Sequence, residues 1–267
     1  MNPIDRLFHD LRSRQKKALM PFIAAGDPDL TMTRELLAAF ADVGCHLCEL
    51  GFPYSDPIAD GPTIQAAFVR ALSAGVKVEK ILDCVAHSKQ RPPTLAMLSY
   101  AIVHRIGADR FAHQAAVAGF AGLIVPDLPV EESKQLSDRC AAENLSLVQL
   151  ITPTTKPERA RRIIEVASGF IYYVSVAGVT GQRSSLPAEI VENLQALRKL
   201  TTLPICVGFG ISQPEHVQQL APHCDGLIVG SAIVRRIENG LANHQSQAAI
   251  VNDVKSFCRS LLTALSP

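Results

Sequence analysis

Apolar runs of four to eight residues alternate with longer amphipathic segments along almost the whole chain, and this alternation restricts the fold most. Short apolar runs bounded by turn residues are typical of parallel strands that are buried on both faces. Amphipathic segments between such runs are typical of the helices that connect parallel strands. The pattern predicts strands at residues 18–25, 46–50, 94–100, 122–125, 145–151, 170–176, 204–207 and 226–229.

The intervening segments predict helices at residues 31–43, 63–74, 78–87, 110–118, 131–142, 158–167, 188–200 and 215–220. Eight strands that each precede a helix, within about 250 residues, fit a (β/α)8 TIM barrel better than an open sheet. Residues 3–15 predict an extra helix before the first strand, and residues 62–90 have room for two helices in one connection. No Gly/Ser-rich or Pro-rich linker divides the chain, so we expect one domain over residues 1–267.

Composition excludes several functional classes. The net charge is +1 with basic residues spread along the chain, so no nucleic-acid binding is expected. The longest uncharged stretch, residues 166–182, is too short and too polar to span a bilayer. The charged start has no signal-peptide core, and we expect a cytoplasmic protein whose seven cysteines are reduced. Cys45 and Cys48 form a C-x-x-C pair, which we interpret as buried structural thiols.

Residues 49–65, which read ELGFPYSDPIADGPTIQ, contain three carboxylates where a barrel would have one strand end and the loop after it. Glu49 lies near the end of an apolar run, and a buried carboxylate is costly unless it is paired or neutralised. Burial should raise its pKa, as suits a group that both gives and takes protons. Asp60 follows in a more solvated loop and should stay ionised, whereas Asp56 has the context of a turn-forming residue.

Glycine-rich turns follow the last three predicted strands, at residues 177–181, 208–210 and 230–231. Glycines let backbone N–H groups approach an anion, and a helix that starts at Ser231 adds the positive end of its dipole. Barrel enzymes commonly bind phosphate after strands seven and eight. The three turns together predict a phosphate site.

The SDP and ADGPTIQ elements resemble the signature of the tryptophan synthase alpha subunit family, and the GVTG, GFGI and GSAIV turns match it too. The resemblance covers almost the whole chain. It implies a carbon–carbon lyase that cleaves indole-3-glycerol phosphate to indole and glyceraldehyde 3-phosphate without a cofactor, in tryptophan biosynthesis. Glu49 would then be the acid and base, and Asp60 would stabilise positive charge at the indole nitrogen.

The resemblance also implies binding residues and a partner. Phe22, Tyr172 and Phe209 would surround the substrate, and the phosphate would be held by Thr180, Gly181, Gly210, Gly230 and Ser231. The partner would be a beta subunit, which binds pyridoxal phosphate and consumes the indole, in an alpha2beta2 complex. Pro53 and Asp56 would lie at that interface.

Three further observations concern individual positions in the chain. The stretch after residue 97 lacks the family's usual Asn, with Ala101 following Tyr100, so this loop departs from the family pattern. Asp127 has the context of a turn-stabilising residue. His46, His104 and His113 show no metal-ligand spacing, so no metal is expected.

Two other functions remain open from the residues. Another phosphate-binding barrel enzyme is one, although the synthase that makes indole-3-glycerol phosphate would need a lysine on an early strand, and the first three runs contain none. A non-catalytic barrel that activates a partner is the other. That alternative predicts loss of Glu49 or Asp60, and both are present.

Overall fold

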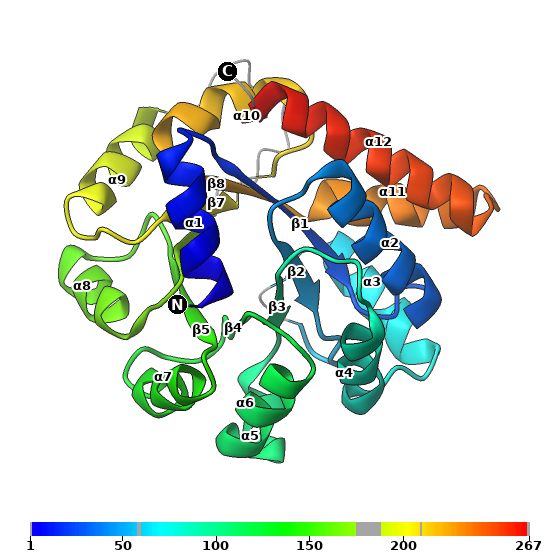
Figure 1. The fold of residues 1–267 in the computed structure, drawn as a ribbon, viewed down its shortest axis with the longest axis horizontal. Coiled ribbons are helices and arrows are strands. Elements are labelled where there is room, and N and C mark those ends of the chain that lie inside the picture. Colours follow the sequence, from blue (N-terminus) through cyan, green and yellow to red (C-terminus); the bar gives the residue numbers. More distant parts are fainter. Residues whose placement is uncertain (1, 58–59, 175–187, 209, 266–267) are drawn as a thin grey trace.

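Eight parallel strands close into a barrel in chain order, from β1 beside β2 round to β8 beside β1. This computed structural model describes residues 2–57, 60–174, 188–208 and 210–265. Helices surround the strands, as Figure 1 shows, and the predicted TIM-barrel fold is confirmed. The strands are β1 (Ala18–Ala24), β2 (Cys48–Gly51), β3 (Thr94–Met97), β4 (Gly122–Ile124), β5 (Ser146–Ile151), β6 (Ile171–Val174), β7 (Ile205–Gly208) and β8 (Gly226–Val229).

The connections contain more helices than the strands require. Two helices join β2 to β3, and two more join β3 to β4. The helices are α1 (Pro3–Ser13), α2 (Leu30–Val43), α3 (Pro62–Ser73), α4 (Val78–His87), α5 (Tyr100–Ile106), α6 (Ala108–Val117), α7 (Ser133–Ala142), α8 (Pro157–Val166), α9 (Ala188–Arg198), α10 (Pro214–Leu220), the 3-10 turn η1 (Ala221–His223), α11 (Ser231–Ala242) and α12 (Gln247–Leu265).

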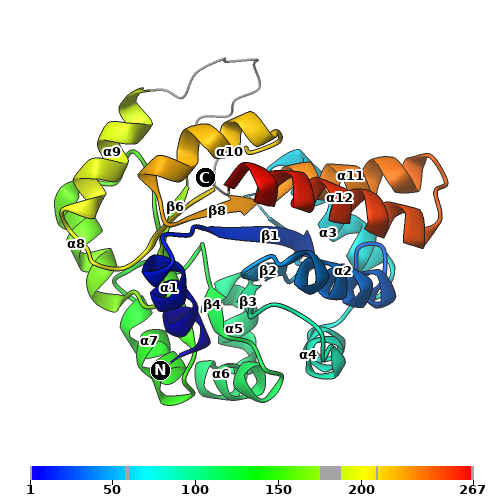
Figure 2. The same cartoon turned by 45° about the horizontal axis from the view of Figure 1, so that its top comes forward.

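The structure corrects the end of one predicted strand and adds a helix that was not predicted. The run at 94–100 ends as a strand at Met97, because Ser99 caps helix α5 by accepting a hydrogen bond from the Ala101 backbone N–H at 3.2 Å. Helix α12 was not predicted at all. It has 19 residues and packs against α2, α10 and α11, as Figure 2 shows. No strand follows α12, so the strand–helix repeat carries no signal for it.

The strand at 46–50 begins later than predicted, at Cys48. His46 instead accepts a hydrogen bond from the Leu19 backbone N–H through Nδ1, at 3.1 Å. Cys45 and Cys48 are buried, and the five other cysteines are also buried free thiols. The interpretation of the C-x-x-C pair as structural thiols therefore agrees with the packing.

The barrel interior and the layer between strands and helices form separate apolar clusters. Side chains alternate across each strand, so neighbouring residues fall into different clusters. Leu47 and Tyr172 lie in the interior cluster, whereas Cys48, Leu50 and Tyr173 belong to the outer one. By the same alternation, Glu49 points into the barrel.

Helix α1 covers the amino-terminal end of the barrel and crosses in front of the strands in Figure 1. Its N-cap, Asn2, accepts a hydrogen bond from the Ile4 backbone N–H at 2.8 Å. Ile4, Phe8 and Leu11 are buried and join the interior cluster, where the Phe8 ring lies 5.8 Å from that of Phe170. Burying such a side chain contributes roughly 1.5–3 kcal/mol, so α1 seals the barrel by apolar packing.

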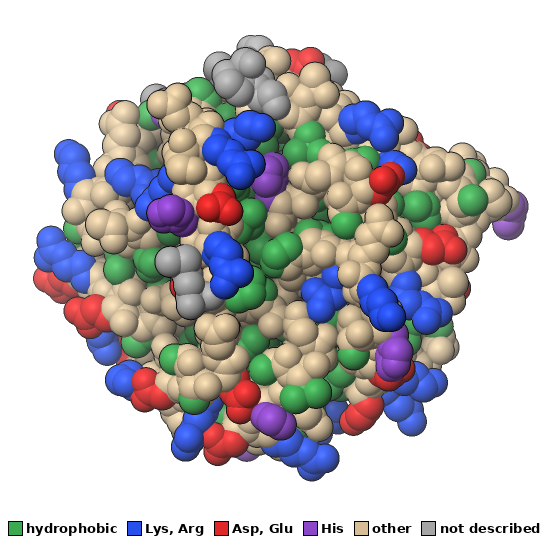
Figure 3. All heavy atoms as spheres, viewed as in Figure 1, with side chains coloured by type: hydrophobic (Ala, Val, Ile, Leu, Met, Phe, Trp, Pro, Cys, Tyr) green, Lys and Arg blue, Asp and Glu red, His purple; other side chains and the backbone are tan. Residues whose placement is uncertain are grey.

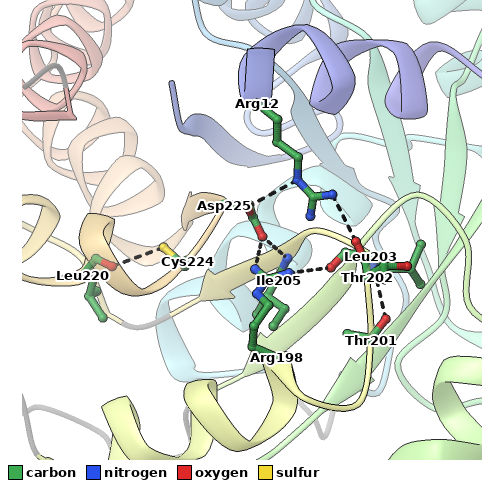
Figure 4. Close-up of polar contacts among 9 residues, drawn as sticks. All are labelled: Arg12, Arg198, Thr201, Thr202, Leu203, Ile205, Leu220, Cys224 and Asp225. Carbon is green, nitrogen blue, oxygen red and sulfur yellow. Dashed lines mark hydrogen bonds and ion pairs between the residues drawn. The ribbon is translucent and has the colours of Figure 1, made fainter. Parts of the chain in front are cut away.

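Polar contacts around Asp225 fasten the same end (Figure 4). Its Oδ1 lies 3.6 Å from Arg12 Nε, and its Oδ2 accepts hydrogen bonds from Arg198 and, at 2.8 Å, from the Ile205 backbone N–H. Arg12 also donates to the Thr202 carbonyl at 3.1 Å. Helix α1 is thereby attached to the segment that leads into β7.

The surface at this end has mixed charge. Figure 3 shows Lys and Arg side chains interspersed with Asp and Glu around the visible face, in keeping with the net charge of +1. Within the described ranges, no helix has the length and apolar character needed to cross a membrane.

Candidate active site

Glu49 occupies an unusual position for a carboxylate. It is the second residue of β2, pairs in register with Phe22 of β1 and Leu95 of β3, and is 0% exposed. Neither of its carboxyl oxygens has a hydrogen-bond partner. Burial alone raises the pKa of Glu49 from the ordinary 4.5 to about 8. The group is therefore protonated at neutral pH and close to giving up its proton, as predicted from the sequence.

Two aromatic side chains predicted to surround a substrate lie in the same interior. Phe22 and Tyr172 are both buried, at 5% and 9% exposure. Burial raises the pKa of Tyr172 well above its ordinary value, and the charges of Glu49 and Asp60 raise it further. Both carboxylates therefore lie near enough to Tyr172 to influence the pKa of its hydroxyl.

Two glycines make room for these rings. A Cβ on Gly51 would lie 2.6 Å from Phe22 Cζ, and one on Gly208 would lie 2.6 Å from Tyr172 Cε2. Such contacts are far shorter than a real Cβ tolerates, so any side chain at either position would displace a ring. The sequence did not predict this role, because the residues around a glycine do not indicate which distant ring will pack against it.

Asp60 lies in the loop between β2 and α3 and is half-buried. Burial raises its pKa, and the nearby Tyr54 side chain opposes that change. Asp60 is nevertheless more exposed than Glu49. The backbone carbonyls of Pro57 and Asp60 accept hydrogen bonds from Gln65 Nε2, at 3.1 and 2.9 Å, so the first turn of α3 holds the loop beside it.

Helix α3 is itself fastened by Arg70, a residue that the sequence analysis did not single out. Arg70 donates two hydrogen bonds to the carboxylate of Asp27, at 2.7 and 2.9 Å, and one to Glu238 at 3.1 Å. Asp27 is buried, follows β1, and has a pKa raised by desolvation and lowered again by Arg70. These hydrogen bonds of Arg70 join α3 to the turn after β1 and to α11. An arginine on a helix gives no local signal of such a partner.

The predicted phosphate turns are described in part. Gly210 has a left-handed φ of +41°, and Gly230 directly precedes α11, which begins at Ser231 as predicted. A Cβ on Gly230 would lie 3.6 Å from the Phe22 side chain, so this turn lies beside the aromatic part of the site. Thr180, Gly181 and Phe209 fall outside the described residues.

The other sequence candidates have simpler roles. Asp127 accepts hydrogen bonds from Ser99 Oγ at 2.6 Å and from the Tyr100 backbone N–H at 2.8 Å, so its side chain bonds to the start of α5 and not, as the sequence had suggested, to its own turn. Asp56 is exposed and Pro53 is buried in the loop after β2. No group of three or more His, Cys, Asp or Glu residues that could hold a metal ion occurs in the described part of the chain.

Comparison with known proteins supplies the family. Residues 8–265 match the family model described as tryptophan synthase alpha chain. The tryptophan synthase alpha chain of Rhodopirellula baltica is 48% identical over 275 residues, which cover 99% of each chain. That of Synechocystis is 44% identical over 269 residues and covers 100% of both chains.

Solved structures agree with the sequence matches. The crystal structure of tryptophan synthase subunit alpha from Legionella pneumophila superposes with a TM-score of 0.91 at 33% identity, covering 99% of this chain and 98% of that one. A tryptophan synthase structure from M. tuberculosis gives a TM-score of 0.88 at 29% identity, with 99% of both chains covered. This chain therefore belongs to the tryptophan synthase alpha chain family, the carbon–carbon lyases that cleave indole-3-glycerol phosphate to indole and glyceraldehyde 3-phosphate.

Proposed function

We propose that Glu49 and Asp60 carry out the family's cleavage reaction in this chain. The protonated Glu49 gives its proton to C3 of the indole ring, which makes the ring a leaving group. The resulting Glu49 carboxylate takes the proton from the side-chain hydroxyl next to the breaking bond. That C–C bond then breaks, its electrons return to the ring, and the hydroxyl carbon becomes the aldehyde of glyceraldehyde 3-phosphate. Glu49 ends the cycle protonated, as it began.

The observation that carries this proposal is the isolation of the Glu49 carboxyl group. It is 0% exposed, without a hydrogen-bond partner, and has a pKa of about 8. A general acid–base group works best when its pKa is near the working pH. A buried group without partners is costly to stability, by about 1–3 kcal/mol. Perturbed carboxyl groups of this kind concentrate at functional sites.

Asp60 supplies the complementary charge. As C3 is protonated, positive charge builds at the indole nitrogen, and a carboxylate beside that nitrogen stabilises it. The half-buried position of Asp60 and its influence on Tyr172 support this role. Burial raises the pKa of Asp60, and the nearby Tyr54 side chain partly offsets that rise.

Substrate binding is proposed to follow the same geometry. Phe22 and Tyr172 contact the indole ring, together with Phe209. The phosphate is bound at the turns with Gly210, Gly230 and Ser231, and with Thr180 and Gly181 of the preceding turn. Helix α11 has 12 residues, and no side chain caps its N-terminus. The backbone N–H groups at the start of such a helix favour an anion.

No cofactor takes part in this proposed cleavage. Pyridoxal phosphate belongs to the beta chain of tryptophan synthase, which we propose as the partner in an alpha2beta2 complex. Substrate and products are small water-soluble or freely diffusing molecules, and we expect the chain to act in the cytoplasm. Cell fractionation with an antibody against the chain would test that location.

The partner surface is proposed at the loop after β2. Pro53 lines a surface groove of about 850 Å³ together with Tyr54, Ser55 and residues of α4 and α5, and Asp56 is exposed next to it. Asp56→Ala should lose much of the activation by the beta subunit and keep most of the activity of the isolated chain. Full retention of activation would exclude Asp56 from the interface.

One assay tests the proposed function directly. Indole release from indole-3-glycerol phosphate is measured with and without a beta subunit, for the wild-type chain and for Asp60→Asn. The wild-type chain should release indole, and Asp60→Asn should lower kcat because a neutral amide cannot stabilise the developing charge. If Asp60→Asn raised only KM, Asp60 would bind the ground state and not the transition state. Absence of indole release in the wild-type complex would overturn the proposal.

A further inference from the structure

Helices α3 and α11 are neighbours on the outside of the barrel, and each begins at one end of the proposed substrate site. Helix α3 starts at Pro62, two residues after Asp60, and α11 starts at Ser231 in the proposed phosphate turn. Apolar side chains of both helices are buried in one cluster, Phe68 from α3 and Val234 from α11. The packing of these two helices therefore sets the separation between the indole end and the phosphate end of the site.

Arg70 joins the two helices by polar contacts. It lies on α3, and its Nε and Nη2 donate to the two carboxylate oxygens of Asp27, at 2.7 and 2.9 Å, while its Nη1 donates to Glu238 Oε1 on α11 at 3.1 Å. The planar guanidinium group holds its donors in a fixed fork, so one side chain serves two acceptors in set directions. The Asp27 side chain is 1% exposed and that of Glu238 is 38% exposed. The contact with Asp27 is therefore shielded from water, and the contact with Glu238 is a more exposed branch toward α11.

The contacts of Arg70 connect to the proposed site through both helices and through β1. On α3, Gln65 Nε2 donates to the backbone carbonyls of Pro57 and Asp60, which attaches the Asp60 loop to the helix that carries Arg70. Asp27 lies in the turn after β1, a strand of the closed barrel. Loss of the contacts of Arg70 would therefore let the Asp60 loop and the start of α11 shift relative to each other and to the barrel.

We propose that Arg70 is a positioning residue, which holds the Asp60 loop and the start of α11 at the separation that the indole and phosphate groups of one substrate require. The inference rests on the proposed function, because it takes the indole to lie beside Asp60 and the phosphate beside Ser231. Arg70 acts through the two helices and not by contact with the substrate. Two groups of one ligand both bind well only when the two parts of the site are correctly spaced, and a misplacement of about 1 Å can cost about 10²-fold in rate.

Three ligands distinguish the spacing of the site from binding at either end: indole, glycerol phosphate, and indole-3-propanol phosphate, in which both groups are joined. Their affinities are measured by NMR titration of the full-length chain. Arg70→Lys keeps the positive charge and loses the fork, so it cannot serve Asp27 and Glu238 in the same way. We expect about tenfold weaker binding of indole-3-propanol phosphate, and a change of less than about twofold for indole or glycerol phosphate alone. The kcat for indole release should also fall about tenfold.

Glu238→Ala tests the branch toward α11 with little effect on the fold, because Glu238 is partly exposed and alanine favours a helix. It leaves the Arg70–Asp27 pair in place, and binding of indole-3-propanol phosphate should weaken about threefold. Asp253→Ala is the matched control, since it removes the acidic partner of Arg236, another arginine of α11, in an exposed pair that leads to α12. Its affinities for all three ligands should match the wild type. Combining Glu238→Ala with Arg70→Lys should weaken binding no further than Arg70→Lys alone.

Three results would overturn the inference. The first is wild-type affinity for indole-3-propanol phosphate in both Arg70→Lys and Glu238→Ala, and the second is additive losses in the double variant. The third is equal weakening of all three ligands with a lower thermal unfolding midpoint, which would mean that Arg70 only stabilises the fold. Failure of the proposed function gives a different result: a wild-type chain that bound indole-3-propanol phosphate and released no indole would refute the lyase activity, while the affinities of the variants would still decide the role of Arg70.

Discussion

At the amino-terminal end of the barrel, each carboxylate oxygen of Asp225 has a partner, whereas Glu49, further along the barrel interior, has none. The Asp225 side chain is 14% exposed and is held by Arg12, Arg198 and a backbone N–H. Glu49 is 0% exposed. Asp225 directly precedes β8 and Glu49 lies within β2, so two acidic residues of one sheet have opposite environments.

The presence or absence of partners decides whether a buried carboxylate contributes to stability or to reactivity. A paired carboxylate contributes to the fold, because its hydrogen bonds replace those it made with water. An unpaired buried carboxyl group costs stability, and its pKa rises into the range where proton transfer is useful. Barrel enzymes place their chemistry at the carboxyl-terminal ends of the strands, and the two carboxylates follow that division.

The largest expected effect is at the unpaired carboxyl group. Glu49→Gln keeps the shape of the side chain and removes the titrating group, so kcat for indole release should fall about 10²–10⁴-fold. Because Glu49 has no partner to lose, chemical denaturation should give a free energy of unfolding no lower than that of the wild type at pH 7. A variant with more than half of the wild-type activity would refute the assignment.

The pH dependence of stability provides a second test. The pKa of Glu49 is higher in the folded chain, about 8, than its ordinary value of 4.5. The folded state therefore binds this proton more tightly, and Glu49 makes the fold less stable as pH rises through that window, by at most about 1.4 kcal/mol per pH unit. The free energy of unfolding of Glu49→Gln minus that of the wild type should increase from pH 5 to pH 8. A constant difference would mean that Glu49 is not buried as described.

Substitution of the paired carboxylate should lower stability and leave activity unchanged, the reverse of the result expected for Glu49. Asp225→Asn removes the charge opposite Arg12 and Arg198, and the free energy of unfolding should fall by about 1–3 kcal/mol. Indole release by the folded variant should be unchanged. Asp253→Asn is the control, because Asp253 pairs with Arg236 on the exposed surface, and such pairs contribute about 0–1 kcal/mol. Loss of activity without loss of stability in Asp225→Asn would break the comparison.

The smallest expected effect concerns ligand binding at the open end. Gly230→Ala adds a Cβ that would make only ordinary contact with Phe22, at 3.6 Å, so the fold should persist. The methyl group should hinder approach of an anion to the backbone N–H groups and raise the inhibition constant of glycerol phosphate about tenfold. Binding of indole, which has no phosphate, should not change. Equal affinity for glycerol phosphate would exclude this turn as the phosphate site.

The sequence alone was sufficient for the fold class and for the choice of Glu49. Apolar runs and amphipathic segments are local patterns, and eight repeats of them leave few architectures other than a closed barrel. A charged residue inside such a run, as at Glu49, is conspicuous for the same reason. That residues 1–267 form one domain, and that the chosen residues are catalytic, remain predictions. Helix α12 escaped notice because no strand follows it.

Only the tertiary structure decided which polar groups are paired. Arg12 bonds to a carbonyl 190 positions away, and Arg70 bonds to Asp27 and Glu238 across three elements. Gly208 needs to be glycine because the ring of Tyr172 lies over it. The isolation of Glu49 likewise arises when the barrel closes. Periodicity reports neighbours within a turn or a strand, whereas desolvation and pairing depend on side chains that folding brings from distant parts of the chain.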